Sequence, residues 1–351
     1  MKHYSLSIIA AIAANIAFAS SSALAQKNSD DKPHVQMQAI LDKLAALKGK
    51  PIEDLSPEEA RRQPTPADAV VSILKEQKKP TIEEVGMTED ITIRIDKNDL
   101  KCRVYKPKGE GPFPIIFYIH GGGWVIADLD TYDSSPRALT NGANAVVFSI
   151  HYRQAPEHKF PAAHEDTYGA YKWVLENGKR WGGNTKNVAM VGESAGGNMA
   201  AAVCIMAQKD GIQMPVHQVL IYPVADTRMD TPSYAENATA KPLNAAMMKW
   251  FANHTFAKEE DVSDPKVALL KAPSLKGLPS ATIITAQIDP LRSEGEALAK
   301  KFRSDGVEVA YRNYEGVTHE FFGMGAVLSE AKEANAFASA NLKAAFAATS
   351  K

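Results

Sequence analysis

The sequence of 351 residues has few of the features that mark disulfide-rich, zinc-binding or nucleic-acid-binding proteins. Its only two cysteines, Cys102 and Cys204, are too few for a disulfide framework, and no Cys-x-x-Cys or His-x-x-x-His pair suggests a metal site. The 40 Lys and Arg residues nearly balance the 41 Asp and Glu residues, and no basic run exceeds two residues. A nucleic-acid partner and a polybasic membrane-binding segment are therefore not expected.

Long apolar stretches are also scarce, and the one that stands out lies at the N-terminus. Lys2 and His3 precede an apolar stretch at residues 6–19, which leads to Ala23-Leu24-Ala25. A basic start, a short apolar stretch and an Ala-x-Ala site are typical of a secretory signal, here residues 1–25, cut after Ala25. Because the stretch is too short to span a bilayer, we expect a secreted or periplasmic protein without stable membrane insertion.

The next part of the chain has helical patterns and no convincing strand. Apolar residues recur at helical spacing over residues 34–47. Ser56 and Thr65 each precede a proline and an acidic residue, which is the pattern of a capped helix start. We therefore predict that residues 26–90 form an N-terminal helical cap segment and a linker.

From residue 91 onward the pattern predicts a doubly wound α/β domain, residues 91–351. Alternating apolar residues at 91–95 and 102–105 predict a hairpin. Continuous apolar runs then alternate with helical segments, as a buried and mostly parallel sheet requires. The runs are residues 115–119, 145–150, 188–191, 219–222 and 281–285, with a last strand at 307–314, and the helices are 162–179, 195–208, 291–303 and 330–347.

One stretch, between residues 222 and 280, is longer than a crossover needs. It contains a stripe of apolar residues at helical spacing: Leu243, Met247, Trp250 and Phe251. We predict an insertion at about residues 226–274 that forms a lid over the strand ends. Ordinary core packing is an equal interpretation for Trp250.

A candidate nucleophile follows the apolar run at 188–191. Gly192-Glu193-Ser194-Ala195-Gly196 stands between this strand and a helix. Strand, Gly-x-Ser-x-Gly and helix in this order are typical of a nucleophile elbow, in which a tight turn lifts the serine hydroxyl above the sheet. A plain glycine-rich turn is the alternative.

A second glycine motif, His120-Gly121-Gly122-Gly123-Trp124, follows the run at 115–119. Glycines let the backbone approach a ligand closely and point amide groups at it. A phosphate loop is disfavoured because Gly-Lys-Ser/Thr is missing. We predict an oxyanion hole from the amides of Gly122, Gly123 and Ala195, and assign His120 to orienting the loop rather than to a base.

A serine nucleophile needs a base, and in this order of elements the base follows the serine. Three histidines come after Ser194: His217, His254 and His319. His217 begins a strand, and His254 lies in the insertion. We therefore predict His319, which follows the last strand, as the base.

The base needs a carboxylate to orient it. Asp289 ends the run at 281–288 and directly precedes Pro290, so we predict it as this acid, although a helix N-cap is an alternative role. Its rivals fit the strand ends less well: Asp226, Glu294 and Glu315.

These motifs resemble the hormone-sensitive-lipase-like branch of the α/β-hydrolases, the bacterial esterase group. Residues 152–163 (Tyr-Arg-Gln-Ala-Pro-Glu-His-Lys-Phe-Pro-Ala-Ala) and 289–295 (Asp-Pro-Leu-Arg-Ser-Glu-Gly) are similar to its signature stretches. The resemblance covers the chain from about residue 90. It implies an eight-stranded, mostly parallel sheet, no cofactor, and a cap that combines the N-terminal helices with the insertion. The chain departs from the family pattern at Gln154, Glu193 and Ser293.

The resemblance also implies a Ser194–His319–Asp289 triad in a carboxylic ester hydrolase that acts on small, short-chain acyl esters. Trp124 beside the glycine loop is compatible with a confined pocket. Two alternatives remain: an amidase or acyltransferase with the same triad, and a non-catalytic binding protein such as the plant hormone receptors of this family, which lack the base histidine. The sequence leaves homo-oligomerisation open. Cys102 and Cys204 are predicted as packing residues in a strand and a buried helix.

Overall fold

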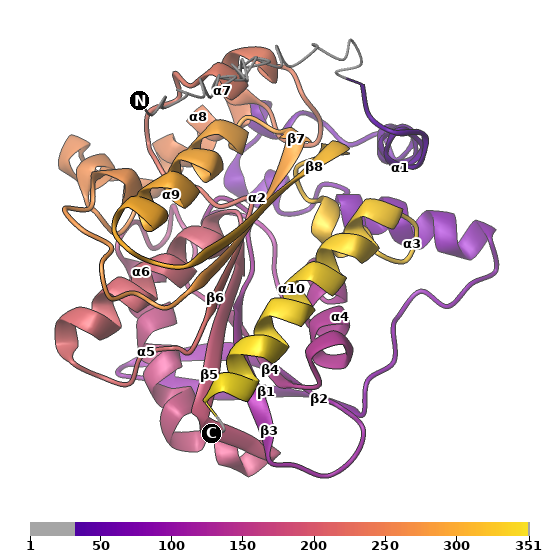
Figure 1. The fold of residues 1–351 in the computed structure, drawn as a ribbon. Helices are drawn as coiled ribbons and strands as arrows, with labels where there is room; N and C mark the ends of the chain where they lie inside the picture. Colours follow the sequence, from indigo (N-terminus) through magenta and orange to yellow (C-terminus); the bar gives the residue numbers. More distant parts are fainter. Residues whose placement is uncertain (1–31, 350–351) are drawn as a thin grey trace, which may run out of the picture. The chain divides into compact units, whose positions relative to one another are not determined.

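One mixed sheet organises the protein. The computed structural model describes residues 32–349, so the predicted signal at residues 1–25 lies outside the described residues. Eight strands pair in the order β1-β2-β4-β3-β5-β6-β7-β8 (Figure 1). All neighbours from β4 to β8 are parallel, whereas β2 is antiparallel to β1 and β4. The strands are β1 (Met87–Ile95), β2 (Asn98–Lys106), β3 (Phe113–Ile119), β4 (Val146–His151), β5 (Gly183–Glu193), β6 (Gln218–Ile221), β7 (Ala281–Ile288) and β8 (Val309–Thr318).

Helices cover both faces of this sheet, which confirms the predicted α/β fold. α5, α6 and α9 lie on one face, and α4 and α10 on the other (Figure 1). The covering helices are α4 (Ser134–Ala143), α5 (Ala162–Asn177), α6 (Ala195–Asp210), α9 (Arg292–Ser304) and α10 (Ser329–Ala348). Among residues 32–349, no helix has the length and apolar character needed to cross a bilayer.

The two covered faces explain the continuous apolar runs. In β3, Ile115, Phe117 and Ile119 belong to one core, while Ile116 and Tyr118 belong to the core on the opposite face. Successive strand residues point to opposite faces, so a strand buried on both faces must be apolar at every position.

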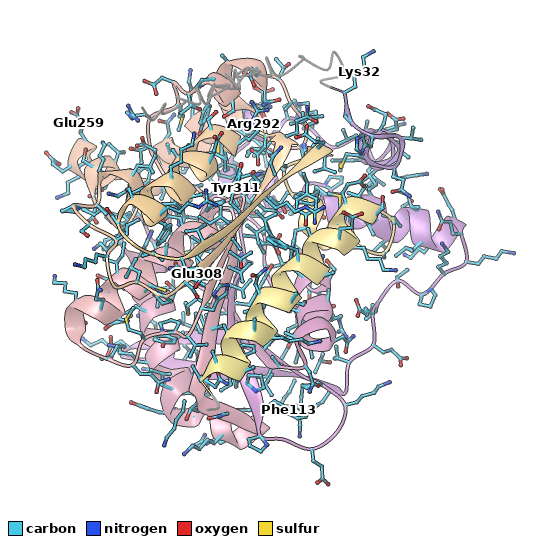
Figure 2. The ribbon with its side chains drawn as sticks, viewed as in Figure 1. Lys32, Phe113, Glu259, Arg292, Glu308 and Tyr311 are labelled. Carbon is cyan, nitrogen blue, oxygen red and sulfur yellow. The ribbon has the colours of Figure 1, made fainter. Side chains whose placement is uncertain are left out.

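The parallel strands end at one common edge, where the candidate residues gather. Figure 2 shows Phe113, which begins β3, and Arg292, which follows the end of β7, at opposite ends of the view. The N-terminal helices are α1 (Val35–Ala46), α2 (Pro57–Ala60) and α3 (Pro66–Glu76), with the short turn η1 (Ile52–Asp54) between α1 and α2. The insertion holds α7 (Pro232–Glu236), α8 (Ala245–Thr255), η3 (Glu259–Ser263) and η4 (Leu269–Lys271).

The N-terminal segment and the insertion contact each other, although about 190 residues separate them. Trp250 Nε1 donates to the Leu55 carbonyl at 3.0 Å, and Asn244 Nδ2 donates to Glu53 Oε1 at 2.9 Å. Trp250 is 8% exposed, so its indole packs between the two segments. Ser56 and Thr65 cap α2 and α3 with complete capping boxes.

Several boundaries differ from the sequence prediction. The sequence does not predict α4, because Leu139 is the only large aliphatic side chain of residues 134–143 and the rest of the buried face is made of small or polar residues. β8 continues to Thr318 instead of ending at Tyr314. Gly316 stands inside this strand with φ +66°, and its amide donates to Gln287 Oε1 at 2.7 Å.

Cys102 and Cys204 are buried in β2 and α6 as free thiols, as predicted.

The turn from β5 to α6 has no space for side chains at its glycines. A Cβ at Gly192 would clash with the Gly196 carbonyl, and a Cβ at Gly196 would clash with the Ile119 carbonyl at the end of β3. The backbone of α6 therefore starts in direct contact with β3, at a distance that only glycine permits.

We predict that Gly196→Ala lowers the free energy of unfolding by roughly 2–3 kcal/mol, because a buried backbone carbonyl must move. Urea denaturation measures this change. Gly325→Ala is the matched control, because its Cβ would meet no atom closer than 3.8 Å, and we expect a change within about 0.5 kcal/mol. Equal effects of the two substitutions would contradict the packing argument.

Candidate active site

Ser194 occupies the turn between β5 and α6 in a conformation that non-glycine residues rarely adopt. Its φ is +56° and its ψ is −120°. The backbone holds this geometry: the Ser194 amide donates to the Ile221 carbonyl at 2.9 Å, and its carbonyl accepts from the Val224 amide at 3.2 Å. Such a residue persists only where its surroundings determine it, and such residues cluster at functional sites. The turn presents the Ser194 side chain to a cavity.

The structure brings His319 and Asp289 to this serine. His319 Nε2 lies 3.0 Å from Ser194 Oγ, and His319 Nδ1 lies 2.7 Å from Asp289 Oδ2. His319 directly follows β8, and Asp289 directly follows β7. The Leu291 amide donates to the other carboxylate oxygen of Asp289 at 2.9 Å. All three side chains are 5% exposed or less.

This arrangement fixes the proton positions. Asp289 accepts from Nδ1–H, which leaves Nε2 of the neutral ring to accept from the Ser194 hydroxyl. Burial acts to lower the pKa of His319, but the charge of Asp289 and its hydrogen bond outweigh burial and raise that pKa above its ordinary value. The three side chains can thus move the hydroxyl proton to a ring whose charged form is stabilised.

The rival residues are engaged elsewhere. The carboxylates bind other partners: Asp226 binds Arg228, Glu294 binds the Ala225 amide and Glu315 binds Asn313. The two alternative histidines also have other partners. His217 forms hydrogen bonds with Ser280 and Thr282, and His254 packs against Trp250.

The glycine loop lies against Ser194. A Cβ on Gly121 would stand 3.1 Å from Ser194 Cβ. Gly122 and Gly123 have φ of +89° and +58°, and a Cβ on Gly123 would clash with the ring of Phe251. Within residues 32–349, the amides of Gly122, Gly123 and Ala195 have no hydrogen-bond acceptor, so they can donate to a ligand.

His120 contacts the glycine loop and is not among the residues that line the cavity. Its Nδ1 donates to the Gly121 carbonyl at 2.9 Å, and its Nε2 accepts from His151 Nδ1 at 3.2 Å. Burial, together with the neighbouring His151, lowers the pKa of His120 to about 3. Tyr152, for which the sequence predicts no separate role, stacks on His120 with 4.4 Å between ring centroids and donates to the Gly121 carbonyl at 2.8 Å.

Beneath the site, Glu193 accepts hydrogen bonds from the hydroxyls of Tyr118 and Tyr222. Burial is the main cause that raises the pKa of Glu193 to about 7, and the negative charge of Glu320 adds to it. The Tyr222 ring packs on His319 with 4.5 Å between centroids. The sequence reveals Tyr118 and Tyr222 only as hydroxyl-bearing residues at apolar strand positions, and it does not show that both meet Glu193.

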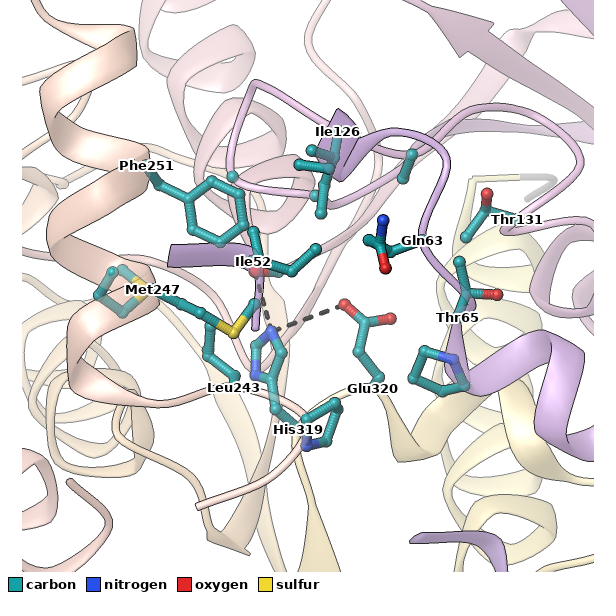
Figure 3. Close-up of a pocket in the computed structure, with 18 of the residues that line it drawn as sticks. Ile52, Gln63, Thr65, Ile126, Thr131, Leu243, Met247, Phe251, His319 and Glu320 are labelled. Carbon is teal, nitrogen blue, oxygen red and sulfur yellow. Dashed lines mark hydrogen bonds and ion pairs between the residues drawn. The ribbon is translucent and has the colours of Figure 1, made fainter. Parts of the chain in front are cut away.

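Ser194 and His319 line a cavity of about 770 Å³. One wall is apolar: Ile52 of the N-terminal segment, with Leu243, Met247 and Phe251 of the insertion (Figure 3). The opposite wall carries polar side chains, of which Gln63, Thr131 and Glu320 are labelled in Figure 3. Trp124 also borders the cavity. Residues 32–349 hold no group of His, Cys, Asp and Glu side chains arranged for a metal ion.

Comparison with known proteins gives the family. A family model described as alpha/beta hydrolase fold matches residues 116–323. The chain belongs to the α/β-hydrolase family. Its resemblance to the hormone-sensitive-lipase-like branch is confirmed, and the protein is an enzyme, as predicted.

Three similar relatives of this α/β-hydrolase are named as ester hydrolases. Carboxylic ester hydrolase LipN of Mycobacterium tuberculosis is 39% identical over 243 residues, which cover 67% of this chain and 64% of LipN. Carboxylesterase NlhH of the same organism is 36% identical over 73% of this chain and 82% of NlhH. Ethyl acetate hydrolase of Pseudomonas putida is 31% identical over 82% of this chain and 90% of that protein.

A solved structure agrees with this family. The hyperthermophilic esterase of the archaeon Pyrobaculum calidifontis superimposes with a TM-score of 0.80 at 36% identity, covering 89% of this α/β-hydrolase and 98% of that chain.

We predict that the His319 ring titrates above the ordinary histidine value of about 6.5, because Asp289 stabilises its charged form. Asp289→Asn should lower the midpoint relative to the wild type, since the charge and the hydrogen bond of Asp289 are the largest of the influences that raise the pKa of His319. Histidine NMR signals followed against pH measure both values. His217 serves as an internal control, because burial lowers its pKa to about 4 and it lies outside the site. A wild-type midpoint at or below 6.5 would contradict the assigned influence of Asp289.

Proposed function

We propose that this α/β-hydrolase is a carboxylesterase that cleaves short-chain acyl esters through Ser194, His319 and Asp289. The relatives named as carboxylic ester hydrolase, carboxylesterase and ethyl acetate hydrolase support ester hydrolysis. The observation that supports the catalytic roles is the chain of two hydrogen bonds from the Ser194 hydroxyl to His319, at 3.0 Å, and from His319 to Asp289, at 2.7 Å.

The reaction begins when Ser194 Oγ attacks the ester carbonyl carbon and His319 Nε2 takes the hydroxyl proton. Asp289 stabilises the resulting imidazolium. The tetrahedral intermediate collapses as His319 returns the proton to the alcohol oxygen, the carbon–oxygen bond breaks, and an acyl-enzyme remains. Water then attacks by the same route, and the acid is released with Ser194 restored.

The negative charge of the tetrahedral oxygen needs donors that are already in place. The amides of Gly122, Gly123 and Ala195 suit this role because they have no acceptor among the described residues. One such donor typically contributes about 3–4 kcal/mol to transition-state stabilisation. The contacts of His120 and Tyr152 with the Gly121 carbonyl support a role of both side chains in holding the loop.

The walls of the cavity beside Ser194 support a confined site for the acyl group. The Phe251 ring packs against Gly123. The insertion and the N-terminal segment together line the cavity beside Ser194. We assign these two segments to a cap over the catalytic domain. Each methylene contributes about 1–3 kcal/mol to discrimination, so the preference for short acyl chains should be graded.

We also propose that the protein is exported after removal of residues 1–25, on the pattern of their sequence. N-terminal sequencing of the exported protein should find Gln26 as the first residue. A protein retained in the cell with Met1 intact would contradict export.

A series of 4-nitrophenyl esters from acetate to dodecanoate tests the main proposal. We expect kcat/KM to be highest for acetate to butyrate and to fall stepwise with longer chains. Ser194→Ala should lower turnover by about 10⁶-fold, because the nucleophile is lost. Faster cleavage of long-chain esters would contradict the chain-length proposal, and full activity of Ser194→Ala would contradict the catalytic one.

Two controls separate the remaining alternatives. An organophosphonate should label wild-type Ser194 with one phosphonyl group per chain, which a non-catalytic binding protein would not show. Matched amides and alcohol acceptors, run beside the esters, distinguish an amidase or an acyltransferase, and we expect the esters to react fastest.

A further inference from the structure

Glu320 places a carboxylate beside the reacting atoms, and the mechanism above gives it no role. It directly follows His319, and its Oε1 lies 3.8 Å from His319 Nε2. Figure 3 shows its side chain directed into the cavity beside the His319 ring. Asp289 binds the far side of the same ring, so the two carboxylates flank His319 on different nitrogens.

The fold holds Glu320 in this position. Its backbone is left-handed, with φ +70°, a conformation that glutamate rarely adopts. The Tyr132 hydroxyl donates to Glu320 Oε1 at 2.6 Å across 188 residues of sequence. Within residues 32–349 the second oxygen, Oε2, receives no hydrogen bond, and the side chain is 23% exposed. One oxygen is thus anchored while the other stays available to a ligand.

The chemistry of ester cleavage decides which part of a substrate meets this carboxylate. His319 Nε2 must protonate the alcohol oxygen as it leaves, so that oxygen comes within hydrogen-bond distance of Nε2. Because Glu320 Oε1 lies 3.8 Å from the same nitrogen, substituents two or three bonds from the alcohol oxygen come against Glu320.

Two other charged residues that line the cavity, Asp128 and Arg61, already have partners. Asp128 already accepts from the Asp130 and Thr131 amides and the Thr131 hydroxyl. Arg61 pairs with Glu157 and donates to two backbone carbonyls. Within the described chain, no lysine or arginine forms an ion pair with Glu320.

We propose that Glu320 forms the alcohol subsite of the enzyme and selects esters whose alcohol part carries a cationic group near the ester oxygen, while it disfavours anionic alcohol parts. Opposite charges about 4 Å apart attract appreciably even in water, and more strongly in a partly enclosed site. This inference rests on the proposed esterase function, since only an ester hydrolase brings a leaving alcohol to His319.

Matched butyrate esters test the subsite at pH 8. The cationic ester is butyrylcholine, its neutral isostere is 3,3-dimethylbutyl butyrate, and the anionic ester is carboxymethyl butyrate. For the wild type we expect kcat/KM of the cationic ester to exceed that of the isostere by about tenfold or more, and the anionic ester to be the poorest. In Glu320→Gln, which keeps an oxygen acceptor for Tyr132, the cationic-to-neutral ratio should fall to within about twofold of one.

The ratio separates specificity from a purely structural role. If Glu320 only positioned His319, Glu320→Gln would change all three esters by the same factor and leave the ratio unaltered. Glu315→Gln removes the same charge from β8 outside the cavity and should retain the wild-type ratio. A wild-type ratio near one, or a ratio that survives in Glu320→Gln, overturns the proposal. Failure of the wild type to cleave even the neutral ester overturns the esterase function instead.

Discussion

The site depends on one close approach between backbones, where α6 begins against the end of β3. Gly196 packs on the Ile119 carbonyl with no space for a side chain. This contact sets the Ala195 amide and the glycine loop beside the same serine, although the two segments are about 70 residues apart. The amides that we propose as oxyanion donors are therefore in position before a substrate arrives, and preorganised donors of this kind need no rearrangement as charge develops.

Much of this arrangement could be predicted from the sequence because it is encoded locally. The pentapeptide around Ser194 specifies its own turn, and a run that is apolar at every position specifies a buried strand. Residues that follow parallel strands must meet at one edge of the sheet, so Asp289 and His319 could be placed near Ser194 from strand order alone. The glycine loop after β3 follows from the same rule.

The parts that the sequence does not predict are set by contacts between distant segments. Tyr132 meets Glu320 across 188 residues, and Tyr118 and Tyr222 meet at Glu193 from two strands. Tyr118 and Tyr222 stand in apolar strand runs and Tyr132 stands in a polar loop, and nothing nearby in the chain shows where any of the three hydroxyls points. The extension of β8 was missed for a related reason. Gly316 is typical of a turn, but here it bends the strand without ending it.

The contact of Trp250 with Leu55 has a consequence for how such an enzyme diversifies. The indole joins the insertion to a segment that precedes the whole sheet, so the apolar wall of the pocket comes from two stretches outside the βα units. Mutations can accumulate in these stretches and reshape what enters, while the strands that fix the reacting groups stay untouched. The apolar part of the recognition surface is thereby encoded apart from the reacting groups, and the two can evolve at different speeds.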